Sequence, residues 1–376
     1  MRQFFGKNHS WSTTGQGIAR GLKAQGHEVD IFSTNGISHF PEDLKSNLVG
    51  YVEENSPKMM KGFADHEYDI EQVYDCQISY TSMKNFPGYL GSGHRNRFGI
   101  WCYEWAGKNV LPNGFAKHYQ SCDWLCPPSE FAKRVFLESK IPEGNMKVIP
   151  HGITADSYRK TATIDLHTKK NFKIGVVLGQ NHKRKNIPGL LTAYGKAFTN
   201  KDDVCLVFKA KEKPVTQGFE VSLHGCIDRF KKTFPQHAEV RIVSEFINDM
   251  SDFYRSVDAT FTMTHCECFY YPALESMAAG KLSIAPNWGG QVDFLNDKNA
   301  LLIDGIETRA DTTSMYWEAK SNAIWFQPSI DDAADKLKYA YNNFEKINLD
   351  IEADKEAVYS KFDWQNIAQQ YLHLCT

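Results

Sequence analysis

The sequence lacks an excess of charge of either sign. Its 43 lysines and arginines nearly balance 45 aspartates and glutamates, which leaves a formal net charge of -2 over 376 residues. Nucleic-acid binding relies on a basic surface that neutralises phosphates, so this balance argues against a nucleic-acid partner. The chain also lacks an apolar run of membrane-spanning length, and it opens on MRQFFG rather than on a signal-peptide pattern. We therefore expect a soluble, cytoplasmic protein.

The spacing of the cysteines and histidines also gives no sign of a disulfide framework or of a metal site. The nine cysteines are odd in number and scattered, without a CxxC pair, which fits a reducing compartment. His265, Cys266, Glu267 and Cys268 are metal-ligand types, but consecutive residues that leave a strand point alternately, and no second cluster accompanies them. We expect no metal and no cofactor, and we expect Cys266 and Cys268 to be small buried side chains.

What the sequence has is an alternation of short apolar strands with amphipathic helices, which is typical of parallel sheets covered on both faces. In the first half we predict strands at HEVDIFS, RFGIWCY, DWLCP and MKVIPH, with helices at residues 16–25 and 129–139. After the polar stretch TIDLHTKKN, a second series runs FKIGVVLG, VCLVFKA, AEVRIVS, DATFTM, KLSIAP and ALLID. The apolar residues after Ser329 recur with the period of a helix. Asp363 is a predicted N-cap. Two doubly wound domains with a cleft between them are the economical interpretation.

The stretch THCECFYYPALESMAAG, residues 264–280, carries two glutamates around the start of a predicted helix. Glu267 lies just past a predicted strand. Pro272 suits the first helical position and Gly280 a left-handed C-cap, which puts Glu275 in the first turn of the helix. Open parallel sheets bind ligands at the carboxyl ends of their strands, and helix N-termini attract anions there. The stretch therefore predicts an anionic ligand.

Two segments of the second half, GVVLGQNHKRKNIPGLLTAY and residues 264–304, resemble the donor-binding domain of retaining glycosyltransferases with the GT-B fold. Glu267 and Glu275 match the two glutamates of that family, which are separated by seven residues. GQGIARGLKAQGHEVDIF, FGIWCYEWAGKNVLP, PPSEFAKRVF and VIPHGI resemble segments of its N-terminal domain. The likeness spans most of the chain and is weakest at residues 40–96. It implies an α/β GT-B fold with Rossmann-like domains at residues 1–165 and 166–354, and a helix at residues 355–376 that packs back on the first domain.

The resemblance also implies an activity, the retaining transfer of a sugar from a nucleoside diphosphate to an acceptor hydroxyl, and a set of site residues. Fixed cations at the departing diphosphate lower the barrier, and Arg184 and Lys185 match that need. The implied donor contacts are Glu267 with the sugar, Glu275 with the ribose, and the backbone of Cys268, Phe269 and Tyr270 with the diphosphate, beside Gly179. Candidates on the acceptor side of the cleft are Gly15, Gly17, Glu104 and His151.

The chain departs from the family pattern in two places. Gln180 follows Gly179 where many members have arginine, and Cys268 and Tyr270 stand where the family favours glycine. Either the loop takes a different path, or Tyr270 shapes the sugar pocket. Two alternatives stay open: a sugar-nucleotide-binding protein without turnover, and a dinucleotide-dependent oxidoreductase built on GQGIARG. The acceptor is a glycan, a lipid-linked or a small molecule, and KMMKG and HRNRF fit a peripheral membrane contact.

Overall fold

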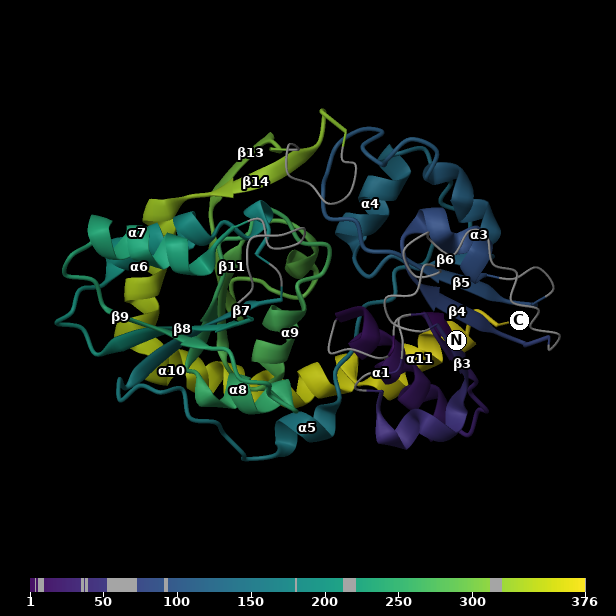
Figure 1. Ribbon diagram of the computed structural model, residues 1–376, viewed down its shortest axis with the longest axis horizontal. Coiled ribbons are helices and arrows are strands. Elements are labelled where there is room, and N and C mark those ends of the chain that lie inside the picture. Colours follow the sequence, from purple (N-terminus) through teal and green to yellow (C-terminus); the bar gives the residue numbers. More distant parts are fainter. Residues whose placement is uncertain are drawn as a thin grey trace. The chain divides into compact units, whose positions relative to one another are not determined.

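The computed structural model describes residues 1–3, 5, 10–34, 37, 40–52, 73–90, 94–179, 181–211, 221–311 and 320–375, without the side chains at 348–350 and 352–353. Gln180 and the KMMKG segment at residues 58–62 lie outside the described residues. The chain divides into two compact units (Figure 1). Unit 1 comprises Met1–Tyr103, Gly107–Thr154 and Ser360–Thr376, and unit 2 comprises Glu104–Ala106 and Ala155–Tyr359.

Unit 1 contains two short parallel sheets. One has the order β1 (Arg2–Gln3), β2 (Ile31–Ser33), β3 (Leu48–Tyr51), and the other has the order β4 (Gln77–Tyr80), β5 (Arg97–Ile100), β6 (Trp124–Leu125). Ser79 Oγ donates to the Arg2 carbonyl oxygen at 2.6 Å, so β4 lies beside β1. The described helices of this unit include α1 (Ser10–Ala24), α3 (Phe86–Tyr89), α4 (Glu130–Glu138) and α11 (Trp364–Leu372), with 3-10 turns η1 (Glu42–Asn47), η3 (Met83–Asn85) and η4 (Ala116–Ser121). The predicted strand MKVIPH is wrong, because only an isolated bridge joins its first residue, Met146, to Leu125.

The glycines of GQGIARG lie inside helix α1. The prediction that the helix starts at residue 16 is wrong, because α1 begins at Ser10. A Cβ atom on Gly17 would lie 2.0 Å from Trp364 Cε2, and one on Gly21 would lie 2.3 Å from the Trp364 carbonyl oxygen. These glycines therefore let α1 approach α11 (Trp364–Leu372) closely. The predicted N-cap of α11 is confirmed, since the Asp363 carboxylate accepts from the Gln365 N–H at 2.9 Å.

Unit 2 is built on a six-stranded parallel sheet with the order β12-β11-β10-β7-β8-β9. The strands are β7 (Phe172–Leu178), β8 (Val204–Ala210), β9 (Glu239–Val243), β10 (Ala259–Phe261), β11 (Leu282–Pro286) and β12 (Ala300–Ile303). All six coincide with predicted strands. The chain winds outward from β7 to β9, then returns to place β10 against the other side of β7. This reversal of strand order makes the sheet doubly wound, as predicted.

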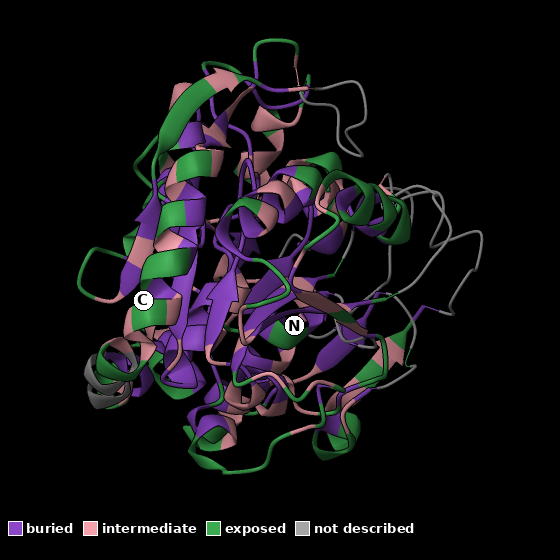
Figure 2. Ribbon diagram, turned by 90° about the vertical axis from the view of Figure 1, so that its left-hand side faces the viewer, coloured by how far each residue is buried: buried purple, intermediate pink, exposed green. Residues whose placement is uncertain are grey.

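Helices cover both faces of this sheet, and its strands are largely buried (Figure 2). On one face, alternate residues of β7 pack with α6 (Ile187–Ala197), α7 (Leu223–Thr233) and part of α10 (Ile330–Phe362). On the other face lie α8 (Met250–Ser256) and α9 (Tyr271–Ala278). A Cβ atom on Gly175 of β7 would lie 3.2 Å from the Phe253 ring, so the glycine lets α8 pack close to the strand. No helix among the described residues is both long enough and apolar enough to cross a membrane.

Shorter elements complete unit 2. They are α5 (Ala155–Arg159), the 3-10 turns η5 (Lys183–Lys185) and η6 (Gly290–Asp293), and the antiparallel hairpin of β13 (Gly305–Arg309) with β14 (Ile324–Pro328). The sequence predicts a domain boundary between residues 165 and 166, and in the structure residues 157 and 164 bond to α8. Ser251 Oγ donates to the Ser157 carbonyl oxygen at 3.0 Å, and Ile164 N donates to Ser256 Oγ at 2.8 Å. These bonds explain why unit 2 begins at Ala155.

Candidate functional site

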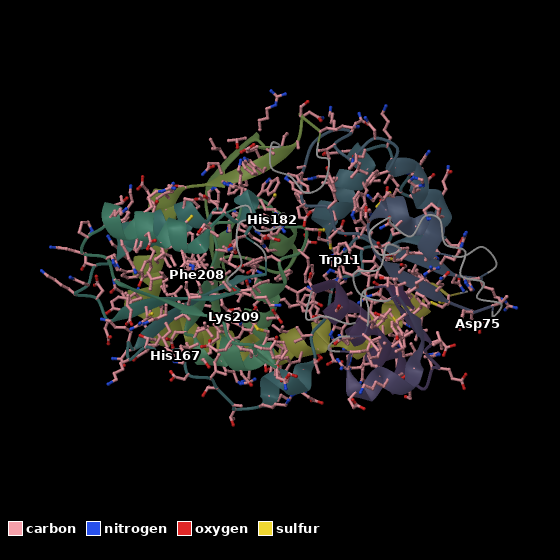
Figure 3. The ribbon with its side chains drawn as sticks, viewed as in Figure 1. Trp11, Asp75, His167, His182, Phe208 and Lys209 are labelled. Atoms are coloured by element: carbon pink, nitrogen blue, oxygen red, sulfur yellow. The ribbon has the colours of Figure 1, made fainter. Side chains whose placement is uncertain are left out.

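The candidate site lies where the strand order in unit 2 reverses, between β7 and β10. Ligands bind outside the carboxyl ends of parallel strands at such a switch point. Residues 181–186 follow β7 and contain η5, whose N-cap is His182 (labelled in Figure 3), and residues 262–270 follow β10. The two segments are tied together, because His265 N and Thr264 Oγ1 both donate to the Arg184 carbonyl oxygen, at 2.6 and 3.1 Å.

An ionic cluster joins these two segments. Glu267 Oε1 lies 2.8 Å from Arg184 Nη1 and 2.5 Å from Lys185 Nζ, and it accepts from Thr264 Oγ1 at 3.1 Å. The three charged side chains are only 9 to 16% exposed. The sequence prediction placed Glu267, Arg184 and Lys185 in one site, and the structure brings them into contact.

The electrostatics of the cluster follow from burial and from the neighbouring charges. Burial acts to raise the pKa of Glu267, but the charges of Arg184 and Lys185 outweigh it and lower this pKa to about 2. Burial and the Arg184 charge lower the pKa of Lys185, while Glu267 opposes that shift. For Arg184, burial is outweighed by Glu267 and Glu104, which raise the pKa. Glu267 is thus a firmly ionised carboxylate at neutral pH, and removing it would leave two buried cations without this counter-charge.

Glu104 enters this cluster from the first half of the chain. Its Oε1 lies 3.4 Å from Arg184 Nη2, and the contact is internal to unit 2 because residues Glu104–Ala106 belong to that unit. An antiparallel bridge between Ala106 and Ile324, at the start of β14, holds the segment in place. Sequence reasoning expected Glu104 on the acceptor side. The structure places it against Arg184, which the resemblance assigns to the donor diphosphate.

The loop after Glu267 keeps a backbone conformation that glycine normally adopts. Tyr270 has φ 64° and ψ 71°, in the left-handed region that a bulky residue rarely occupies. Close packing fixes this path, because a Cβ atom on Gly290 would lie 1.7 Å from the Cys268 carbonyl oxygen. The Tyr270 ring centroid lies 6.0 Å from Lys185 Nζ. Tyr270 therefore occupies the glycine position with the glycine conformation, and its ring borders the ionic cluster.

Glu275 lies in the second turn of α9, so the prediction that it belongs to the first turn is wrong. Its carboxylate accepts hydrogen bonds from Tyr254 Oη of α8 at 2.7 Å and from Tyr158 Oη of α5 at 3.3 Å. Burial raises the pKa of Glu275 to about 7, although both tyrosine hydrogen bonds act to lower it. The left-handed cap at Gly280, with φ 68°, is confirmed. Sequence reasoning missed both tyrosines, and no motif marks them.

The remaining predicted residues have different surroundings. Gly179 follows β7, and a Cβ atom there would meet nothing within 4 Å, so packing does not require a glycine. Phe269 packs on Phe294, with ring centroids 5.1 Å apart. Gly15, Gly17 and His151 belong to unit 1. Trp364 fills the space that Gly17 leaves, and a Cβ atom on Gly15 would lie 2.0 Å from Gln3 Nε2, so packing within the chain requires both glycines.

The HCEC stretch does not gather into a metal site. His265 Nδ1 lies 2.8 Å from the Phe326 carbonyl oxygen, and the imidazole stacks on Trp325 with ring centroids 4.2 Å apart. Cys266 and Cys268 are buried. Among the described residues, no group of three or more His, Cys, Asp and Glu side chains could hold a metal ion. All nine cysteines lie in the described part of the chain, and no disulfide joins any of them.

Comparison with known proteins extends these observations. No protein-family model matches the sequence. The chain is 24% identical over 266 residues to a lipopolysaccharide 1,2-N-acetylglucosaminetransferase of Salmonella typhimurium, a match that covers 69% of this chain and 62% of that protein. The match thus spans less than two thirds of the Salmonella relative. An uncharacterized glycosyltransferase of Methanocaldococcus jannaschii is 21% identical over 389 aligned positions, which cover 96% of this chain and 92% of that one.

Solved structures share the fold. A glycosyltransferase from Rickettsia africae superposes with a TM-score of 0.68 at 19% identity and covers 100% of this chain and 97% of its own. HepE of Anabaena in complex with UDP-glucose also gives a TM-score of 0.68, at 13% identity, over 100% of this chain and 99% of its own. Likeness at this level of identity establishes the fold, and the α/β GT-B fold expected from the sequence is confirmed. In fold, and in sequence along most of its length, the chain is similar to GT-B glycosyltransferases.

Proposed function

We propose that the chain is a retaining glycosyltransferase that moves a sugar from a nucleoside diphosphate to an acceptor hydroxyl. The observation that carries the proposal is the contact of Arg184 and Lys185 with Glu267 at the switch point of unit 2. The relatives named as glycosyltransferases support the reaction class, and HepE of Anabaena, which was crystallised with UDP and with UDP-glucose, supports a nucleoside diphosphate sugar as donor.

The two cations supply what the leaving group needs. Breaking the bond between sugar and diphosphate builds negative charge on the departing oxygen, and buried, fixed cations stabilise that charge more than they stabilise the ground state. Arg184 and Lys185 are 16 and 14% exposed, and each is held by a carboxylate before a donor arrives. Little reorganisation is therefore needed in the transition state. No obligatory metal is required in this proposal, because the charge is supplied by side chains.

The properties of Glu267 favour an orienting role over proton transfer. A carboxylate with a pKa of about 2 is a poor general base near neutral pH, where an efficient base has a pKa close to that of the solution. Its Oε1 is already held by Arg184, Lys185 and Thr264. We therefore assign Glu267 to the donor-sugar hydroxyls. The departing diphosphate oxygen takes the acceptor proton on the same face of the sugar, which retains the anomeric configuration without a protein nucleophile.

Glu275 is assigned to the ribose of the nucleotide. Both Glu267 and Glu275 act on Tyr270: burial raises the pKa of its hydroxyl, the two carboxylate charges add to that rise, and a hydrogen bond with Thr262 opposes it. The two glutamates thus lie within electrostatic reach of one side chain. One donor molecule that extends from its sugar to its ribose accounts for this arrangement.

A thermal-shift screen of nucleoside diphosphates and their sugars, with and without a chelator, tests the proposal. A ligand that binds only the folded state raises the melting temperature with concentration. We expect stabilisation by one intact sugar nucleotide and by its free nucleoside diphosphate, with UDP and UDP-glucose as the first probes, and no loss in chelator. Loss of binding in chelator would contradict the assignment.

Turnover separates an enzyme from a protein that only binds sugar nucleotides. The stabilising donor is incubated with glycan, lipid-linked and small-molecule acceptors, and release of nucleoside diphosphate is measured. NMR of the product then reports the anomeric configuration. Retention supports the proposal, whereas inversion contradicts it, and stabilisation without release of nucleoside diphosphate favours the binding protein.

A further inference from the structure

Cys102 of unit 1 stands in a cluster that the glycosyltransferase proposal does not use. It lies two residues past the end of β5, at the carboxyl edge of a parallel sheet. Its sulfur is 2.8 Å from Tyr80 Oη and 3.6 Å from His151 Nε2. Tyr80 Oη is in turn 3.4 Å from His151 Nε2. Three side chains from different segments therefore meet around one sulfur atom.

Both partners can donate hydrogen bonds to the ionised sulfur. The phenol carries an O–H, and the imidazole carries an N–H on Nε2 once it has accepted the thiol proton. Tyr80 and His151 are buried and held by ring packing, with their centroids 5.4 Å apart, and Trp11 of α1 (labelled in Figure 3) packs on Tyr80 at 5.1 Å. Two fixed donors directed at one atom are an arrangement that stabilises a thiolate.

The environment of Cys102 differs from that of most other cysteines in the chain. Cys126, Cys205 and Cys266 are buried, and burial raises the pKa of each thiol. Cys102 is half-buried. Cys375 is also half-buried, and its sulfur contacts the Tyr371 carbonyl oxygen and the Cys76 thiol.

We propose that Cys102 is a nucleophilic thiol and a modification site for soft carbon electrophiles and low-mass disulfides, with His151 as its proton acceptor and Tyr80 as a donor to the ionised sulfur. Among the described residues, Tyr80 of β4 and His151 are titratable groups that contact the sulfur.

Neither alkylation nor disulfide exchange at Cys102 needs an oxidant or reductant other than the reagent itself. His151 takes the thiol proton, and the thiolate attacks the electrophile. With iodoacetamide, a carbon–sulfur bond forms and iodide leaves. With a low-mass disulfide, a mixed disulfide forms on Cys102 and the second thiolate leaves and takes up a proton, so one disulfide is exchanged for another.

Timed labelling of the native, reduced full chain with limiting iodoacetamide tests the proposal. Peptide mass spectrometry gives the rate at each cysteine between pH 5.5 and 9.5. We expect Cys102 to react with a pH midpoint below about 8.5, the value of an ordinary thiol. His151→Gln should move this midpoint up toward that value and slow labelling at pH 7 by about tenfold, because less thiolate is present. Tyr80→Phe should shift the midpoint in the same direction.

Two cysteines serve as internal controls. Cys205 is fully buried and reports folding, because it is labelled only if a variant has opened. Cys375 should keep its own pH profile in both variants. If His151→Gln opens the protein, the isosteric Tyr80→Phe variant decides. The proposal is overturned if Cys102 resists labelling in the native wild-type chain, or if its pH profile is unchanged in the variant that remains folded.

Discussion

Replacing Glu275 with glutamine should stabilise the protein while it weakens nucleotide binding. Burial raises the pKa of this carboxyl from 4.5 to about 7, so the folded chain retains a proton on Glu275 at pH values where the unfolded chain has released it. The contribution to stability is fully present below pH 4.5 and is lost as the pH rises through about 7. Glutamine is neutral throughout and can keep a hydrogen bond from Tyr254, which lies 2.7 Å from the carboxylate.

The magnitude follows from the difference between the two pKa values. At 1.36 kcal/mol for each pKa unit, ionised Glu275 costs on the order of 3 kcal/mol of unfolding free energy above pH 7. For a domain of 150 to 250 residues this corresponds to about 6 to 12 °C in melting temperature. The variant and the wild type should therefore melt together near pH 4.5 and separate progressively up to pH 8.

Melting curves of both proteins at pH 4.5, 6 and 8 measure this difference. Glu356→Gln is a matched control, because the Glu356 side chain is 66% exposed and pairs with Arg159 at the surface, where ion pairs contribute about 0–1 kcal/mol. The reasoning is refuted if Glu275→Gln melts below the wild type at pH 8, or if the separation between the two proteins does not grow with pH.

Three further predictions concern the loops around the site. Arg184→Ala and Lys185→Ala should each lower turnover more than donor affinity in steady-state kinetics, since their charges matter most as the leaving group develops its own; wild-type turnover in both would contradict the diphosphate role. Gly290→Ala should destabilise the chain, since its Cβ would lie 1.7 Å from a carbonyl oxygen, whereas Gly179→Ala, with nothing within 4 Å, should melt like the wild type; equal melting of the two would contradict the packing described for the loop. Tyr254→Phe removes the 2.7 Å hydrogen bond to the carboxylate of α9 and should move the pH midpoint of nucleoside diphosphate binding upward; a calorimetric titration series with an unchanged midpoint would show that this tyrosine does not set the ionisation.

The sheet of unit 2 was predictable because its strands are buried on both faces and therefore form continuous apolar runs. FKIGVVLG and VCLVFKA are examples, and both are strands in the structure. The resemblance assigned the basic loop and Glu267 to one donor site, and the structure shows that both segments leave the carboxyl ends of neighbouring strands. The strands themselves were predictable from local pattern alone.

The features that sequence reasoning missed depend on contacts between distant segments. The sequence predicts that Gly17 lies in a helix, but not that Trp364 fills the space beside it. Tyr158 and Tyr254 lie on α5 and α8, helices of five and seven residues that are too short to show a helical period. Glu104 joins unit 2 because Ala106 pairs with Ile324, and no local sequence pattern predicts such a bridge.

The most direct test of the donor site compares nucleoside diphosphate affinity with single-turnover rate in Glu267→Ala and Glu275→Ala. Glu275→Ala should weaken the diphosphate and the sugar nucleotide alike, since hydrogen bonds to an ionised group contribute about 1.5–3 kcal/mol each. Glu267→Ala should keep or raise diphosphate affinity, because it removes the counter-charge of Arg184 and Lys185 at 2.8 and 2.5 Å, while single turnover falls steeply as the sugar loses its position. Equal losses in the two variants, or no loss in either, would contradict the division of the donor between the two glutamates.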